Sequence, residues 1–160
     1  MTFSNQAADP YRESVYSLEN LALPDNGRRF GRFAELQLYV DAVLTSPWWD
    51  QQFPQAPIEV ELFRRSRSAT FSAAAVDGSG NEAAIWIRDG SWDAVTVVHE
   101  LAHLASAQRA HTPDPTGPHG QEFATALLLL WRELLGVHAY GALRSGFDGQ
   151  GVPYRRERLF

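Results

Sequence analysis

The chain contains no cysteine in its 160 residues. Disulfide bonds and thiolate zinc sites are therefore excluded, so a buried apolar core must hold the fold together. The length and the 44% content of apolar residues are typical of one globular domain that can bury such a core. Any metal ion would have to be bound by histidine, aspartate or glutamate. We expect residues 1–160 to form a single domain, with flexible ends at residues 1–10 and 148–160.

The charge balance and the apolar stretches argue against nucleic-acid binding, membrane association and secretion. The formal net charge is −5 and the pI is about 5.5, which gives no general attraction to nucleic acid. The longest apolar stretch, residues 123–131, is too short to span a membrane, and the first thirty residues lack the apolar segment of a secretion signal. We therefore expect a cytoplasmic protein without membrane association or clear nucleic-acid binding, and interpret the arginines near the C-terminus as a solvated tail.

The first half of the chain predicts helix followed by strands. From Phe30, apolar residues recur every three or four positions, which predicts an amphipathic helix ending before Pro47. Residues 11–23 are compatible with either a helix or a strand. Alternating or apolar segments with an intervening Asp77–Gly80 turn then predict three short strands. These strands are expected at residues 58–62, 69–76 and 83–87.

The second half predicts two helices joined by a proline-rich loop. The long apolar segment from Trp92 to Ala110 is expected to be helical, and another helix should run from about His119 to Leu135, closed by Gly136. The glycine-containing region after Val137 is expected to be irregular or weakly helical. The fold class is therefore α+β, in which a small sheet of three or four strands packs on an N-terminal helix and the helix of residues 92–110, followed by a further helix.

Two histidines of the segment His99-Glu100-Leu101-Ala102-His103 have the spacing of a metal site on a helix. Side chains four residues apart project from one face of a helix, so both imidazoles can reach the same ion. Glu100 lies beside them and can reach a water molecule without occupying a coordination position. In a competing interpretation, the β-branched run of residues 95–98 forms a buried strand and the histidines have no metal.

A third ligand is expected from the region after the proline-rich loop. His119 is the preferred candidate, because the loop would reverse the chain and bring it to the start of the next helix. His111 is a weaker candidate, since it lies just past the end of the helix that carries His99 and His103. Three histidines and one water molecule would make an open, catalytic zinc site with one Zn²⁺ per chain. A capping or solvent-facing role for His119 stays open.

The segment from Val97 to His103, followed by His119-Gly120 and Phe123, resembles the SprT-like and related minimal zincins, especially a group of actinobacterial metallohydrolases of similar length. The resemblance implies a zincin-like fold with His99, His103 and His119 as zinc ligands and Glu100 as the catalytic base. It extends over about residues 30–136. A chain without cysteine lacks the zinc ribbon of many DNA-associated SprT-like proteases. The metzincin pattern is also absent, because Ser106 and Arg109 replace its required glycine and third histidine.

Several other residues have two possible roles. His138 and Tyr140 could stabilise an oxyanion in the active site, although a packing or surface role is the simpler interpretation. Glu122 could accept a hydrogen bond from a ligand histidine, but we favour an ordinary carboxylate in the first turn of a helix. We interpret Trp48, Trp49 and Trp86 as part of the core or of a cleft wall.

The sequence thus predicts a zinc-dependent hydrolase, a metallopeptidase acting on a peptide or protein substrate. The strand of residues 84–88 is expected to pair with that substrate as an edge strand. Two alternatives are a non-catalytic zinc-binding or interaction module and a SprT-like DNA-associated protease. The pattern does not determine the substrate or the oligomeric state.

Overall fold

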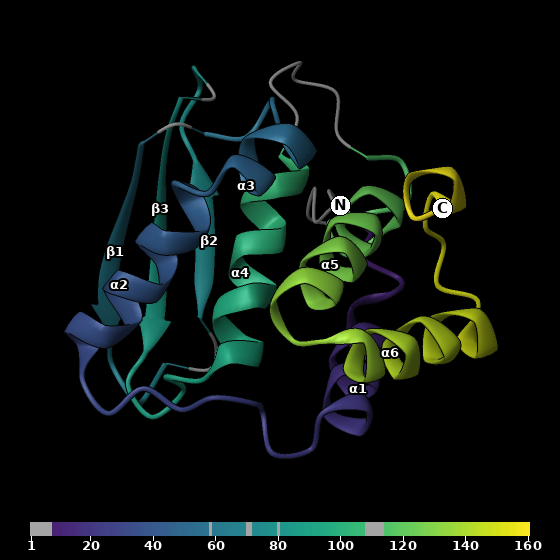
Figure 1. Ribbon diagram of the computed structural model, residues 1–160, viewed down its shortest axis with the longest axis horizontal. Coiled ribbons are helices and arrows are strands. Elements are labelled where there is room, and N and C mark those ends of the chain that lie inside the picture. Colours follow the sequence, from purple (N-terminus) through teal and green to yellow (C-terminus); the bar gives the residue numbers. More distant parts are fainter. Residues whose placement is uncertain (1–7, 58, 70–71, 80, 108–113) are drawn as a thin grey trace, which may run out of the picture. The chain divides into compact units, whose positions relative to one another are not determined.

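The computed structural model describes residues 8–57, 59–69, 72–79, 81–107 and 114–160. It has helices and a small three-stranded sheet, so the predicted α+β class is confirmed (Figure 1). The contacts of the chain divide it into two compact units. One unit comprises residues 25–111, and the other comprises residues 1–24 and 112–160.

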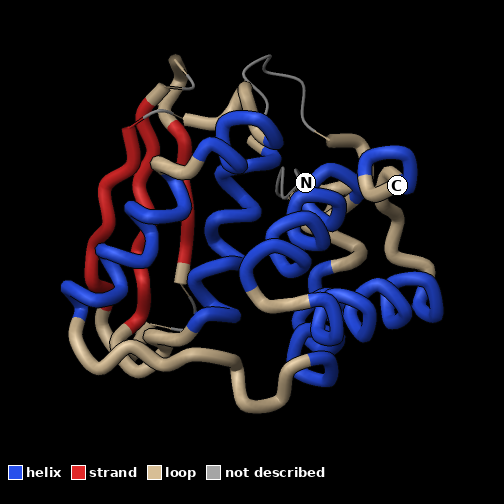
Figure 2. Tube along the Cα trace, viewed as in Figure 1, coloured by secondary structure: helices blue, strands red, loops and turns tan. Residues whose placement is uncertain are grey.

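The unit of residues 25–111 contains the sheet (Figure 2). Its strands are β1 (Glu59–Arg65), β2 (Ala73–Val76) and β3 (Glu82–Arg88), in the spatial order β1-β3-β2. β1 pairs with β3 in parallel, and β2 pairs with β3 antiparallel. The three predicted strands are therefore confirmed, but β3 is central. The expectation that residues 84–88 form an edge strand is wrong, because both sides of β3 already pair with neighbouring strands.

Three helices complete this unit, α2 (Phe33–Leu44), α3 (Pro47–Gln52) and α4 (Ala94–Ser106). The predicted helix before Pro47 is confirmed as α2, which buries Leu36, Val40 and Val43. α4 contacts β2 and β3. Ile85 and Ile87 alternate with more exposed neighbours along β3 and are fully buried, which places the core of the unit on one face of the sheet.

The other unit is helical and contains α1 (Arg12–Ala22), α5 (Gln121–Leu134) and α6 (Val137–Gln150). The ambiguous segment of residues 11–23 is the helix α1, and the predicted helix after His119 is confirmed as α5. Nine consecutive residues of α5, from Phe123 to Trp131, are buried. α6 contacts both α1 and α5.

The region after Val137 differs from the expectation of an irregular or weakly helical tail. It forms the 14-residue helix α6, because Tyr140, Leu143 and Phe147 recur at helical spacing and are buried. Gly146 also serves packing, since a Cβ atom there would lie 2.6 Å from Cδ2 of Leu18 on α1. The glycine lets the two helices approach closely, which outweighs its low helix propensity.

The C-terminal residues also differ from the expected solvated tail. Leu159 is buried, and its carbonyl oxygen accepts a hydrogen bond from Arg132. Arg155 pairs with Glu122 and Arg156 with Asp148, so both of these arginines have carboxylate partners. Residues 156–158 form a short 3₁₀ helix. Among the described helices, none combines the length and the apolar content that a membrane span requires.

Candidate metal centre

The helix α4 carries the first two histidines of the candidate site. Its N-cap is Asp93, whose side chain accepts a hydrogen bond from the backbone N–H of Thr96 at 2.8 Å. The interpretation of residues 95–98 as a strand is wrong. Val97 and Val98 are fully buried in the helix, so packing overrides the low helix propensity of β-branched residues.

His99 and His103 lie on one face of α4. Their ring centroids are 5.1 Å apart with an interplanar angle of 71°, as expected for side chains one helical turn apart. His99 is buried, and His103 is partly exposed. Glu100, which follows His99, is 3% exposed. The local geometry therefore places two imidazoles and one carboxylate within a single turn of a buried helix.

A separate turn positions His119 immediately before α5. The Asp114 carboxylate accepts hydrogen bonds from Thr116 and from the backbone N–H of Glu122, and the Thr116 hydroxyl accepts one from the backbone of Gln121. These bonds satisfy N–H groups of the first helical turn. Gly120 is required here, because a Cβ atom would lie 2.1 Å from the Thr116 hydroxyl oxygen.

The hydrogen bonds of Asp114 also control its ionisation. Burial raises the pKa of its carboxyl group, but the bonds from Thr116 and from the Glu122 backbone outweigh that effect and hold the pKa below the usual 3.8. Asp114 is therefore charged at neutral pH, in the orientation that caps α5. The N-terminus of a helix stabilises such a negative charge, because unpaired backbone N–H groups are concentrated there.

His119 is buried and held by a carboxylate that lies 110 positions earlier in the sequence. Its Nδ1 lies 2.8 Å from Oδ2 of Asp9, and its backbone N–H donates to Oδ1 of the same residue at 3.2 Å. When Nδ1 donates a proton to a carboxylate, Nε2 keeps the lone pair that a metal requires. The capping and solvent-facing roles left open for His119 are therefore not what the structure shows.

The surroundings of Asp9 and His119 fix the imidazole further. The His119 ring is 4.8 Å from the Phe123 ring and 5.6 Å from the Tyr16 ring, measured between centroids. Gly117 has a φ of +96°, and a Cβ atom there would lie 2.7 Å from the carbonyl oxygen of Ala8. This glycine allows the N-terminal segment to approach the turn closely, which brings Asp9 to His119.

The structure brings together one ligand nitrogen from each of His99, His103 and His119. These three atoms all lie within 4.8 Å of one another. Zinc binds imidazole nitrogen at about 2.0–2.1 Å, so ligand nitrogens around a tetrahedral ion are about 3.4 Å apart. Three neutral imidazoles are also a donor set that suits zinc. The group could therefore hold a metal ion.

The remaining predicted site residues have different surroundings. His111 lies outside the described residues. His138 is exposed in the first turn of α6, and Tyr140 is buried with its hydroxyl 3.3 Å from a guanidinium nitrogen of Arg144. Glu122 is in the first turn of α5, as we favoured, and pairs with Arg155 at 2.6 Å. Neither His138 nor Tyr140 belongs to the three-histidine group, so their role in stabilising an oxyanion stays a prediction.

Asp9 is the residue of the candidate site that sequence reasoning missed. It lies in the segment expected to be flexible, and no spacing rule connects it with His119. Only the fold shows their contact. Comparison with protein-family models, with curated proteins and with solved structures gives no match to this chain. The likeness to SprT-like zincins therefore stays a prediction.

Proposed function

We propose that this chain is a zinc-dependent hydrolase of peptide bonds with the zincin arrangement of ligands. His99, His103 and His119 would each bind the ion through one imidazole nitrogen. The observation that carries the proposal is the grouping of these three nitrogens within 4.8 Å of one another. A structural zinc site usually has four protein ligands, whereas three would leave a position for a water molecule, on which the neighbouring Glu100 could act.

The chemistry proposed for the protein side chains follows from their positions. A zinc ion supplies a Lewis acid that makes a bound water molecule more acidic and polarises a substrate carbonyl. Glu100 would accept the proton of that water and then donate it to the leaving amine, so one carboxylate serves first as base and then as acid. Asp9 would hold His119 in the tautomer that leaves Nε2 for the metal, as its contact with Nδ1 supports.

An extended substrate would need a strand with an open edge. Among the described strands, β1 and β2 both have this property, since they lie at the two ends of the sheet order and each pairs only with β3. Of these two, β2 is the strand with the close contact to α4, which carries His99 and Glu100. We therefore propose β2, in place of residues 84–88, as the edge to which a peptide adds. Main-chain hydrogen bonds to such an edge would give affinity with little sequence preference.

The Glu100→Gln variant tests the proposed hydrolase. Zinc-loaded wild type should cleave an unstructured protein such as casein, and Glu100→Gln should lose at least about 100-fold of that rate, because general-base catalysis contributes about 10²–10⁴-fold. The zinc content should stay at one ion per chain. Glu133→Gln removes the same charge from an exposed position and should keep the wild-type rate.

Other outcomes of this experiment favour the alternatives. Stoichiometric zinc without cleavage by the wild type would support a non-catalytic zinc-binding module. Cleavage only in the presence of DNA, with salt-dependent DNA binding, would support a SprT-like DNA-associated protease. Equal rates for Glu100→Gln and wild type would exclude Glu100 as the base.

A further inference from the structure

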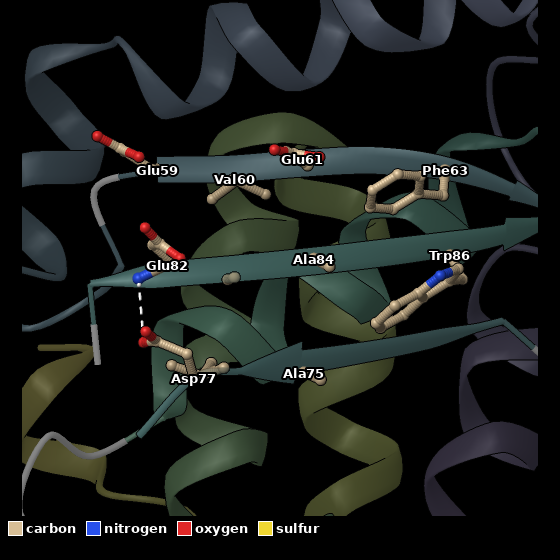
Figure 3. Close-up of a pocket in the computed structure, with 11 residues that line it drawn as sticks. Glu59, Val60, Glu61, Phe63, Ala75, Asp77, Glu82, Ala84 and Trp86 are labelled. Carbon is tan, nitrogen blue, oxygen red and sulfur yellow. Dashed lines mark hydrogen bonds between the residues drawn. The ribbon is translucent and has the colours of Figure 1, made fainter. Parts of the chain in front are cut away.

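A groove of about 650 Å³ lies on the face of the sheet opposite to the buried Ile85 and Ile87. Figure 3 shows the side chains that line it, drawn from all three strands. Phe63 and Trp86 stand at one end, and Glu59, Glu82 and Asp77 stand at the other. The groove shares no residue with the three-histidine group, so it is a feature separate from the proposed active site.

The hollow arises from the sizes of neighbouring side chains on this face. Glu61 of β1, Ala84 of β3 and Ala75 of β2 are register partners and form one row across the sheet. The two alanines have small side chains, so this row is low over β3 and β2. Larger side chains project from the same face on both sides of it, because residues two positions apart on a strand share a face. They are Phe63 and Trp86 on one side, and Glu59, Glu82 and Asp77 on the other. The floor between them consists of backbone and of the alanine methyl groups.

The aromatic end of the groove is a flat pair of rings. Phe63 and Trp86 are register partners whose rings are stacked at an interplanar angle of 20°, with centroids 5.9 Å apart. Phe63 is 41% exposed, and Trp86 is partly exposed. Of the two roles that the sequence left open for Trp86, core or cleft wall, the structure shows the second, since Trp86 lines the groove. Exposed aromatic faces of this kind attract cations, and arginine guanidinium groups in particular.

Three exposed glutamates give the opposite end of the groove a negative charge. Glu59 and Glu82 are directly opposite each other in the register of β1 and β3, and both are exposed, as is Glu61. No ion pair found in the described part of the chain involves any of these three glutamates. Like charges at directly opposed positions destabilise a sheet. A cation placed between them would remove this repulsion.

The size of the face limits what can occupy it. Two strands of seven residues and one of four, about 4.8 Å apart and rising about 3.3 Å per residue, cover roughly 300 Å². A stable dimer interface usually buries about 800 Å² on each partner. This face alone is therefore too small for a stable interface between two copies of the chain. An extended peptide fits this area, and the charge of the groove requires it to be positive.

We propose that this groove docks a basic, extended segment of a partner protein. An arginine or lysine side chain of the segment lies against Phe63 and Trp86, and its apolar stem covers Ala75 and Ala84. Another basic side chain pairs with Glu59 and Glu82. Long basic side chains combine an apolar stem with a charged end, which matches a groove that has an apolar floor and an acidic wall.

Fluorescence anisotropy with a nine-residue peptide of alternating arginine and alanine tests the proposal on the full-length protein. The labelled peptide should bind, and its counterpart with glutamate in place of arginine should not. Two double variants test the two ends of the groove, Glu59→Gln/Glu82→Gln and Trp86→Phe/Phe63→Ala. Each should weaken binding by about fivefold at low salt, because exposed ion pairs and cation–π contacts each contribute up to about 1 kcal/mol. Glu13→Gln/Glu133→Gln, with the same change of net charge, should leave the affinity unchanged.

NMR locates the peptide independently of affinity. The indole N–H resonance of Trp86, identified by its loss in Trp86→Phe, should shift as the arginine peptide is added. An unshifted resonance, or equal weakening by the groove variants and the Glu13→Gln/Glu133→Gln control, would overturn the proposal. A shift produced by calcium chloride and not by the peptide would also overturn it, since the groove would then bind divalent cations instead of a basic segment.

Discussion

Single residues decide whether His119 can serve as a metal ligand. A histidine binds a metal through a nitrogen that carries no proton, and a hydrogen bond at the other nitrogen selects that tautomer. Asp9 makes this bond with Nδ1 of His119 and also accepts from its backbone N–H. The same carboxylate therefore fixes both the ring and the main chain at the start of α5.

Replacing Asp9 with alanine should weaken zinc binding by about 10–100-fold, the usual effect of removing a carboxylate that orients a ligand histidine. Asp9→Asn should have a smaller effect, because its amide oxygen can still accept the Nδ1 proton. Competition with a chromogenic zinc chelator measures both affinities. Asp50→Ala, at an exposed position, provides the control. Unchanged affinity in a folded Asp9→Ala protein would refute the orienting role.

At the scale of an element, the glycines of α6 have unequal roles. A Cβ atom at Gly146 would lie 2.6 Å from Cδ2 of the buried Leu18, whereas nothing lies within 4 Å of a Cβ atom at Gly141. Gly146 permits close packing between α6 and α1, whereas Gly141 only lowers the helix propensity of its segment. A sequence pattern does not distinguish them.

Gly141→Ala should increase the free energy of unfolding by about 0.5–1 kcal/mol, as alanine does in the interior of a helix. Gly146→Ala should instead decrease it by about 1–3 kcal/mol, the usual cost of overpacking a core. Chemical denaturation measures both. In the double variant Leu18→Ala/Gly146→Ala, the second substitution should no longer destabilise. Equal stabilisation by both single glycine variants would contradict the packing role of Gly146.

The N-terminus of α5 depends on an ionised carboxylate. The pKa of Asp114 is lowered in the folded protein, so the stability it contributes is present above its unfolded pKa of 3.8. That stability is lost as the pH falls through the lower, folded value. The cap of α5 should therefore weaken only in acid.

Asp114→Asn should destabilise the protein by about 1 kcal/mol near neutral pH, because the charged cap is lost. The difference in Tm from wild type should be constant between pH 5 and 7 and should shrink below pH 3.8. Thermal unfolding followed by circular dichroism at several pH values measures it. Asp50→Asn should show no such dependence, and a difference that grows in acid would have the wrong sign for a lowered pKa.

At the scale of the whole molecule, the three-histidine group exists only in the folded chain. His99 and His103 come from α4, and His119 from the turn before α5. A metal that binds this group binds the folded state and not the unfolded state. Binding therefore adds to the free energy of unfolding in proportion to the logarithm of the metal concentration.

Zinc should raise the Tm of the metal-free protein by about 10 °C when its free concentration is about 1,000 times the Kd, and EDTA should reverse the change. His119→Ala should lose most of this zinc-dependent shift, because two imidazoles bind zinc much more weakly than three. His138→Ala, at an exposed histidine, should keep it. Differential scanning fluorimetry measures the shift, and a full shift in His119→Ala would show that another residue completes the site.

The sequence by itself determined the elements whose signals are local. The spacing of His99 and His103 requires a helix to bring their side chains together, and the periodicity after Phe30 and the alternation around Val60 define a helix and a strand. The motif also singled out His119, since the proline-rich loop separates two helical segments. The predictions of the helix, of the strand and of the pair His99 and His103 needed only contacts between residues a few positions apart, whereas the grouping of His119 with that pair depends on the fold.

Only the tertiary structure decided features that depend on distant contacts. Asp9 meets His119 across 110 positions, and Gly146 lets α6 approach Leu18 of α1 closely. β3 is central because β1 pairs with it in parallel, and the alternation of a single strand carries no information about its neighbours. The free energy of these contacts comes from pairs of residues far apart in the chain, which a local pattern does not encode.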